Sequence, residues 1–439
     1  MKKLFAITAT LLAIILMFTA CSHNKTSSDT ETTTQQSTDM FTDRDLETEY
    51  DESIAQKITV SESNSDIKIT AGGTYILSGS TSDGSVTVDV PDTDKVQLVL
   101  NGVSITSKTS SALYVKSADK VFVTTVKGTE NTLSNGGSFT SSDESKIDGA
   151  VFSKSDIVFN GEGTLNIKSP SAHGIVGKDD VKFTSGTYNI ECASHGIDAN
   201  DSIRITNSTI NITSGKDGMH CENKDTEEKG YIYIESGTFE IKSGDDGIHA
   251  NTYLTVDGGT FNITAAEGLE ATCIKINDGT IYIEASDDGI NAAKKSSVAT
   301  PTVEIGGGKI TIVMGKGDTD GIDSNGDIII NGGTVDVTGN SSFDYDGKGV
   351  INGGTVIVNG SEVTTLPNQF MGGGMPGGMN GKPGEMAPND ATTSATPDAN
   401  GTPEMRNGNS ENRPSPGEFD NSNRPKKPSK NTSETADNI

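Results

Sequence analysis

The chain has 439 residues, a formal net charge of −27, few aromatic residues and no tryptophan. So acidic a chain would repel phosphate groups, which argues against nucleic acid as a partner. An anionic polysaccharide could approach only with divalent cations between the two surfaces.

The first 21 residues have the pattern of a secretion signal. Two lysines precede an apolar run that is too short for a comfortable membrane span, and small residues lead to a cysteine. Phe18-Thr19-Ala20-Cys21 looks like a bacterial lipobox, which implies removal of residues 1–20 and a lipid on Cys21. We therefore expect an exported chain, lipid-anchored in the cell membrane on its extracellular face. The alternative is an ordinary signal peptide with an incidental cysteine.

Two polar segments flank the expected folded region. Residues 21–51 are rich in Ser and Thr, and they have too few apolar residues to bury a core, so we expect a disordered tether. Residues 366–439 are rich in Gly, Pro, Met and Asn, which predicts a disordered tail. The folded domain should therefore span residues 52–365.

Between these segments, apolar residues alternate with polar ones. Pairs such as Ile67 and Ile69, or Val121 and Val123, have the period of two that is typical of β-strands. No stretch has a convincing helical period. The sequence therefore predicts an all-β domain.

A repeated phrase indicates a solenoid rather than a sandwich. A Gly-Thr step, alternating apolar residues and a small residue lead to an acid-Gly-apolar turn, and the turn glycines recur after 21 or 22 residues. Longer intervals contain polar inserts at about 223–229 and 294–301. This period fits one coil of a parallel β-helix, whereas the leucines of a leucine-rich repeat are missing. Residues 52–140 lack the phrase, and we expect them to cap the helix against edge pairing.

Aligned repeats predict the interior. One column of small residues contains Cys192, with Ser169 and Ala265 each one place out of alignment, and a second contains Cys221. We interpret these cysteines as small buried residues, and expect no disulfide framework from them and Cys273. A ladder of isoleucines replaces a conventional core, at Ile167, Ile190, Ile212, Ile241, Ile263 and Ile283.

Acidic residues recur at matched positions beside the repeat glycines. Equivalent residues of adjacent coils lie about 4.8 Å apart, so stacked carboxylates repel one another unless a cation bridges them. Many hard oxygen ligands favour Ca²⁺ over zinc or magnesium. The alternative is a series of solvated turns in which Asp and Asn bond the backbone. The candidate calcium ligands are Asp198, Asp217, Asp245, Asp246, Glu267, Glu270, Asp287, Asp288, Asp320 and Asp323.

Most of these positions fall into two columns, the turn column and the strand column. The turn column precedes each glycine and comprises His173, His195, Asp217, Asp246, Glu267, Asp288 and Asp320. The strand column lies two places after the glycine and comprises Asp198, His220, His249, Glu270, Asn291 and Asp323. The histidines suggest two pairs on adjacent coils, His173 with His195 and His220 with His249. Zinc is conceivable there, but the scarcity of soft ligands favours hydrogen-bonding turn histidines.

Several phrases resemble a known family. They are Tyr50-Asp-Glu, Val99-Leu-Asn-Gly-Val-Ser-Ile105, Ala118-Asp-Lys120, Gly128-Thr-Glu-Asn-Thr-Leu133, Phe152-Ser-Lys154, Lys178-Asp-Asp180 and Asp225-Thr-Glu-Glu-Lys-Gly-Tyr231. Over about residues 50–365 the chain resembles the bacterial carbohydrate-binding β-helix proteins first described from a cellulolytic clostridium. The resemblance implies a right-handed parallel β-helix similar to that of family 9 pectate lyases, bound calcium, and binding of cellulose and acidic sugars such as polygalacturonate. His173 and His195 depart from the family's acidic turns.

Three functions are compatible with this pattern. The leading hypothesis is a non-catalytic surface protein in which calcium bridges protein carboxylates to polysaccharide. The rival is a calcium-dependent polysaccharide lyase, in which Lys178, Lys216 or Lys224 removes a proton beside a uronate carboxylate. The third is a structural surface protein that calcium merely stiffens. The sequence carries no signal for an oligomeric state.

Overall fold

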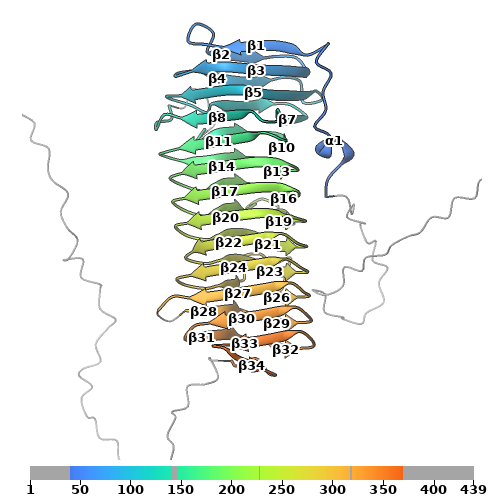
Figure 1. The fold of residues 1–439 in the computed structure, drawn as a ribbon, viewed down its shortest axis with the longest axis vertical. Helices are drawn as coiled ribbons and strands as arrows, with labels where there is room; N and C mark the ends of the chain where they lie inside the picture. The colour runs from blue at the N-terminus through green and yellow to red at the C-terminus, as the bar shows by residue number, and fades with distance from the viewer. Residues whose placement is uncertain (1–39, 141–145, 227, 317–318, 369–439) are drawn as a thin grey trace, which may run out of the picture. The chain divides into compact units, whose positions relative to one another are not determined.

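The structure, a computed structural model, describes residues 40–140, 146–226, 228–316 and 319–368. Within these ranges the chain winds through successive coils, and strands pair in parallel with the equivalent strands of the next coil (Figure 1). The expected all-β parallel β-helix is therefore confirmed. The secretion signal, Cys21, most of the tether and almost all of the tail lie outside the described residues. None of the described residues form a helix long and apolar enough to cross a membrane.

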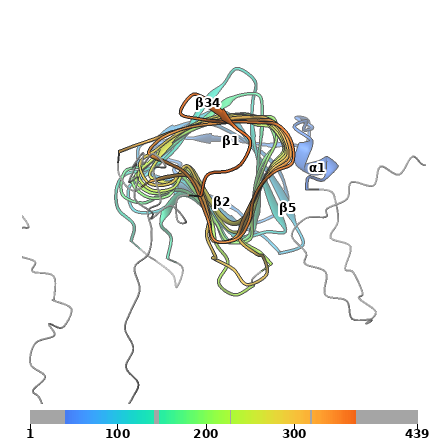
Figure 2. The same ribbon diagram turned by 90° about the horizontal axis from the view of Figure 1, so that it is seen from below.

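Three ladders of strands surround the core, as the end-on view shows (Figure 2). The first ladder contains β1 (Gln56–Val60), β3 (Gly73–Thr81), β5 (Lys95–Ser107), β7 (Lys120–Thr125), β10 (Asp156–Gly161), β13 (Asp180–Phe183), β16 (Ser202–Ile205), β19 (Tyr231–Ile234), β21 (Ile248–Val256), β23 (Leu269–Ile276), β26 (Thr302–Ile305), β29 (Asp327–Ile330) and β32 (Gly349–Ile351).

The second ladder follows in each coil. It contains the end of β5, then β8 (Glu130–Asn135), β11 (Thr164–Ser169), β14 (Gly186–Cys192), β17 (Ser208–Ser214), β20 (Gly237–Ser243), β22 (Thr260–Ala265), β24 (Thr280–Ala285), β27 (Lys309–Met314), β30 (Thr334–Thr338) and β33 (Thr355–Val358). The antiparallel β34 (Ser361–Val363) pairs with β33 at its end.

The third ladder carries the repeated turns. It contains β2 (Asp66–Ile69), β4 (Ser85–Asp89), β6 (Leu113–Ser117), β9 (Gly149–Ser153), β12 (His173–Gly177), β15 (Ile197–Ala199), β18 (Met219–Cys221), the starts of β21 and β23, β25 (Ile290–Ala292), β28 (Asp320–Ser324) and β31 (Ser341–Tyr345). In the coils that carry the acid-Gly-apolar phrase, each strand of this ladder begins beside the turn glycine, so the third ladder positions both polar columns.

Residues 52–140, expected to cap the helix, are themselves its first coils. Strand β5 pairs in parallel with β7, and β7 with β10, so the early coils continue directly into the repeated ones. Their inward residues, such as Val86 and Val88, are buried like those of later coils. Alternating apolar residues are enough to build these coils, even though their turns lack the acid-Gly phrase.

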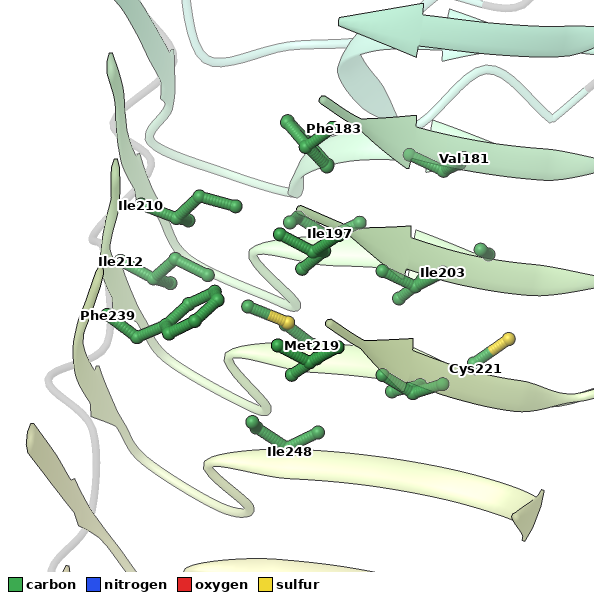
Figure 3. Packing of buried hydrophobic residues seen from close by; sticks show 14 of the residues in the cluster. Val181, Phe183, Ile197, Ile203, Ile210, Ile212, Met219, Cys221, Phe239 and Ile248 are labelled. Carbon is green, nitrogen blue, oxygen red and sulfur yellow. The ribbon is translucent and has the colours of Figure 1, made fainter. Parts of the chain in front are cut away.

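Stacked apolar side chains fill the interior. The six isoleucines of the predicted ladder pair coil upon coil and are at most 2% exposed. Neighbours such as Ile212, Met219 and Phe239 converge on the same space (Figure 3). Full burial of each such side chain stabilises the fold by about 1.5–3 kcal/mol. The apolar ladder therefore supports the third ladder from inside.

The two small-residue columns are confirmed, with one difference. Ser169 pairs directly with Cys192, and Lys242 pairs with Thr264, which aligns Ala265 with the same column. No offset is needed at either position. Burial raises the pKa of the Cys192 thiol to about 11, so it stays a neutral filler at physiological pH. Cys192, Cys221 and Cys273 form no disulfide.

The turn glycines are required by close approach between coils. A Cβ atom on Gly218 would lie 2.6 Å from the carbonyl oxygen of Gly247, and a Cβ on Gly247 would lie 2.5 Å from that of Gly268. Any side chain would push adjacent coils apart. This steric requirement explains why the glycine recurs in every acid-Gly-apolar turn.

Residues 40–51 are ordered, although their composition predicts that they belong to the disordered tether. They include the short helix α1 (Asp43–Leu46), which lies against the outside of the first ladder (Figure 1). Asp45 is fully buried, with its carboxylate 3.0 Å from Lys120 Nζ and 2.8 Å from Lys182 Nζ. Burial opposes ionisation of Asp45, but the hydrogen bond from Lys182 lowers its pKa to about 2. This buried ion-pair cluster helps to fix a segment that is too polar to be recognised as folded. Hydrogen bonds add to it, such as the one that Thr184 Oγ1 donates to the Asp45 carbonyl oxygen at 2.8 Å.

We predict that Asp45→Asn strongly destabilises this part of the domain. The substitution keeps the side-chain shape but leaves the Lys120 and Lys182 charges without their carboxylate. Breaking a buried ion pair in this way costs about 3–5 kcal/mol. The measurement is the denaturant midpoint of the full-length chain. Asp43→Asn, on an exposed residue of the same helix, is the control, and equal midpoints for the two variants would contradict the prediction.

Candidate functional site

The strand column is confirmed by the register of the third ladder. Asp198 pairs with His220, His220 with His249, and His249 with Glu270, and the series continues to Asp323. Asp344 extends it by one more coil through its pairing with Asp323. Sequence reasoning missed Asp344 because Ser342 replaces glycine in its turn.

The turn column is also continuous, through backbone hydrogen bonds between coils. Gly218 N donates to Asp246 O at 2.8 Å, and Gly247 N donates to Glu267 O at the same distance. Two of the ten predicted ligands do not join either column. Asp245 and Asp287 precede the turn column and are exposed to solvent, and so they are peripheral to any shared cation.

The middle of the two columns lines an open hollow of about 360 Å³. Its lining residues are His195, Lys216, Asp217, His220, Asp245, Asp246, His249, Glu267, Glu270 and Lys295. Polar side chains from several coils therefore face one surface depression. It can accept a cation together with part of an extended ligand.

Four histidines form one continuous stack rather than two separate pairs. The ring centroids of His173 and His195 are 5.1 Å apart, those of His195 and His220 are 4.5 Å apart, and those of His220 and His249 are 5.0 Å apart. The stack passes from the turn column to the strand column between His195 and His220. Burial lowers the pKa of His173 at its end, so this ring favours the neutral form.

Two carboxylates lie next to the Nδ1 atoms of histidines in the stack. His220 Nδ1 donates to Asp198 Oδ1 at 2.8 Å, and His195 Nδ1 lies 3.0 Å from Asp217 Oδ2. Burial alone would raise the pKa of both carboxyl groups. The adjacent histidines more than offset it, and the pKa of each carboxyl is lowered, with His220 acting on Asp198 and His195 on Asp217.

His249 is the cationic centre of the hollow. Its Nδ1 is 2.8 Å from Asp246 and 2.6 Å from Glu270. Burial disfavours its charge, yet these carboxylates raise the pKa of His249 to about 10. Burial would raise the pKa of Glu270, but the hydrogen bonds from His249 and Lys295 lower it to about 2. Lys295, 2.6 Å from Glu270, was not predicted because it lies on the insert after β25.

Other carboxyl groups of the columns have raised pKa values, chiefly because burial disfavours their charge. Burial raises the pKa of Glu267 to about 8, helped by the charge of Glu270, and raises that of Asp288 to about 7. Asp246 and Asp323 have a pKa of about 6, again chiefly through burial. Stacking thus produces the repulsion that the sequence predicted. A divalent cation would relieve it by favouring the ionised forms.

The described residues provide one oxygen-only group on the third ladder that suits a hard cation. Ligand atoms of Asp246, Glu267 and Glu270 lie within 4.8 Å of one another. Their donor chemistry fits Ca²⁺, which accepts several carboxylate oxygens and backbone carbonyls. Asp288, Asp320 and Asp323 continue the acidic columns on the following coils without forming so close a group.

Another oxygen-only group, which sequence reasoning missed, lies at the far end of the third-ladder strands. It comprises Asp179, Asp180 and Asp201. Arg204 Nη2 is 2.8 Å from Asp180, and Lys229 from the 223–229 insert pairs with Asp201. Burial and a hydrogen bond with Asp201 raise the pKa of Asp179 to about 7. None of these three carboxylates lines the acidic hollow, and two of them are already paired with cations, so we interpret the group as a structural cluster.

The three lysines that were considered as possible bases do not share one site. Lys216 lines the acidic hollow, whereas Lys178 lines a second hollow of about 510 Å³ with Lys146, Asp148, Phe152 and Lys154. In that second hollow, Lys178 Nζ lies 5.7 Å from the centre of the Phe152 ring. Lys224 is exposed, 3.5 Å from Glu222, and lines neither hollow. Of the three, only Lys216 faces the carboxylate columns.

We predict that, in chelator, the protein becomes less stable as pH rises from about 5 to 8. The raised pKa values of Asp246, Glu267 and Asp288 mean that the folded state binds more protons than the unfolded state in this window, so stability falls with rising pH. His249, whose pKa is also raised, acts in the same direction. Thermal unfolding midpoints measure the trend.

Glu267→Gln tests the assignment, because it removes the carboxyl group with the pKa of about 8. Its midpoint should fall less between pH 5 and 8 than that of the unmodified chain. Glu240→Gln, on the outer side of β20, is the charge-matched control and should keep the full slope. A midpoint that rises with pH in chelator would refute this account of the columns.

A family model and a curated relative agree with the sequence resemblance. Residues 63–273 match the family model described as carbohydrate-binding domain-containing protein. A curated carbohydrate-binding domain-containing protein of Acetivibrio thermocellus is 33% identical over 134 residues, covering 30% of this chain and 47% of that protein, so the match spans about half the relative's length. A solved structure, described as that of the polysaccharide lyase-like protein from C. thermocellum in a gadolinium derivative, is 23% identical with a TM-score of 0.42, covering 68% of this chain and 96% of that one. Over residues 63–273, the chain is thus similar to carbohydrate-binding domain-containing proteins, which confirms the resemblance stated from its sequence.

Proposed function

We propose that the protein binds acidic polysaccharide without cleaving it, through calcium ions held on the third ladder. The observation that carries the proposal is the pair of stacked carboxylate columns, in which Glu267 and Asp288 have raised pKa values. Four column carboxylates, those of Asp217, Asp246, Glu267 and Glu270, line an open hollow. The similarity to carbohydrate-binding domain-containing proteins supports the choice of a carbohydrate ligand.

Calcium is proposed to bind first at Asp246, Glu267 and Glu270. These side chains come from adjacent coils and supply only oxygen atoms. Binding would move the His249 proton or the Lys295 amine away from the carboxylates, and it would ionise Glu267. Asp288, Asp320 and Asp323 prolong the negative field along the rod and are proposed as ligands for further ions. Such ions would keep open positions for uronate carboxylates or sugar hydroxyls.

The lysines of the two hollows are proposed to complete an acidic-sugar surface. Lys216 and Lys295 lie among the carboxylates of the acidic hollow, and Lys146, Lys154 and Lys178 line the second hollow on the same ladder. A polyuronate lying along the coils could thus alternate between metal-bound and lysine-bound carboxylates. The chain has no tryptophan for a flat stacking platform, which favours this polar mode. Polygalacturonate is the proposed ligand, with cellulose as a second one.

A lyase is the second candidate, and Lys216 is the observation that favours it. This exposed lysine lines the hollow beside Asp217 and Asp246, where a proton acceptor would be needed. A lysine ammonium among these side chains is, however, also well placed to pair with the carboxylates of a uronate chain. We therefore propose that Lys216 contacts sugar carboxylates and does not abstract protons.

The exported, lipid-anchored location remains part of the proposal. A lipid on Cys21 would put residues 22–39 between the membrane and α1, which lies against the first ladder. The proposed polysaccharide surface belongs to the third ladder. The anchor would therefore leave the hollow accessible.

The test is binding of the full-length chain to polygalacturonate and to cellulose, with calcium and with chelator, while unsaturated product is followed by ultraviolet absorbance. We expect calcium-dependent binding to polygalacturonate and no product. Glu267→Gln combined with Asp288→Asn should weaken this binding at least about tenfold, because neutral amides replace two charged ligands. The charge-matched control, Glu240→Gln with Asp336→Asn on the second ladder, should bind as the unmodified chain does.

The other outcomes identify the rival functions. Unsaturated product that disappears in Lys216→Ala would make the protein a lyase. Polygalacturonate binding that survives chelator would remove calcium from the mechanism. Calcium binding that raises the unfolding temperature without any sugar binding would leave a calcium-stiffened structural rod.

A further inference from the structure

The N-terminal end of the acidic hollow differs chemically from the rest. There, His195 and His220 bring nitrogen atoms next to the Asp217 carboxylate, and ligand atoms of all three residues lie within 4.8 Å of one another. The oxygen-only group of Asp246, Glu267 and Glu270 lies on the coils that follow. The same hollow thus contains two ligand sets of different hardness.

His195 Nδ1 is the least satisfied atom of this end. It is buried and forms no hydrogen bond among the described residues, although it faces Asp217 Oδ2 at 3.0 Å. The side chain of Asp217 is only 5% exposed. A nitrogen and a carboxylate oxygen that face each other without a well-aligned hydrogen bond can share a metal ion, whereas a buried imidazole nitrogen left alone costs free energy.

His220 is held in the tautomer that a metal needs. A carboxylate accepts hydrogen bonds, so the 2.8 Å contact with Asp198 Oδ1 places the proton of His220 on Nδ1. Its Nε2 then has a free lone pair. Asp217 is positioned similarly, because its other oxygen accepts a 3.1 Å hydrogen bond from Asp246 N. Such supporting contacts are typical around metal-binding histidines and carboxylates.

We propose that His195, Asp217 and His220 form a site for a borderline divalent ion such as Zn²⁺, distinct from the oxygen-only calcium group. Two imidazoles and one carboxylate are a common protein ligand set for zinc, and the open hollow leaves a fourth position for water or a sugar hydroxyl. Ca²⁺ prefers six to eight oxygen ligands and is a poor match for two nitrogens. Asp198 is a positioning residue, since it acts through His220.

The test is calorimetric titration of the metal-free full-length chain with ZnCl₂ in excess Ca²⁺, together with the visible spectrum of the Co²⁺ form. We expect one zinc ion that calcium does not displace, and Co²⁺ absorption typical of a four-coordinate site. His195→Asn and His220→Asn should each weaken zinc binding at least about tenfold. Asp198→Asn should weaken it about 10–100-fold, as is typical for a residue that orients a ligand.

Controls separate this site from general histidine binding and from the proposed function. His173→Asn removes a stacked ring outside the ligand group, and Glu267→Gln removes a calcium ligand; both should keep zinc affinity within about twofold. Circular dichroism must show that each variant is folded, and calcium binding by His195→Asn must persist. Zinc binding that is absent, that calcium displaces, or that survives both histidine substitutions would overturn the proposal and leave the stack as a packing feature. None of these results depends on polysaccharide binding.

Discussion

The close approach of the turn glycines is the constraint on which the rest of the site depends. Because no side chain fits between one glycine and the carbonyl of the next, each coil must present the same backbone atom at the same height. A slip of one residue would also turn the isoleucine ladder outward, at a large loss of buried apolar area. The polar residues before and after each glycine therefore lie next to their equivalents on the adjacent coils. This repetition produces the turn column and the strand column.

Because adjacent coils are so close, the acidic side chains of the repeats interact electrostatically with one another. An isolated turn aspartate would be solvated, but Glu267 and Asp288 are partly buried and have acidic neighbours above and below, which keeps their pKa values high. The molecule partly compensates with internal cations. His249 and Lys295 neutralise Glu270, and Lys229 neutralises Asp201. A buried carboxyl group that has no such partner favours its protonated form when no metal is bound.

Much of this organisation was predictable because a period of 21 or 22 residues and a period of two both follow from backbone geometry. The isoleucine ladder, the cysteine positions and the strand column from Asp198 to Asp323 could all be read from aligned repeats. Contacts that depend on irregular segments could not. Lys295 reaches Glu270 from an insert, and Asp45 is buried by lysines distant in sequence. The single stack of histidines was missed because His195 and His220 belong to different columns, which meet only when the turn is folded.

The ladder also shows how ligand chemistry can change along one solenoid without a change of fold. The backbone around His195 repeats around Glu267, and only the side chains before and after the glycine differ. Replacing a carboxylate by an imidazole at a fixed position exchanges a hard ligand for a softer one while preserving the spacing between neighbours. A solenoid can therefore vary its cation preference coil by coil, because packing constrains the inward residues and leaves the outward columns free. In this protein, the nitrogen-rich coils come first and the oxygen-rich coils follow, so a chain-like ligand lying along the rod would meet both.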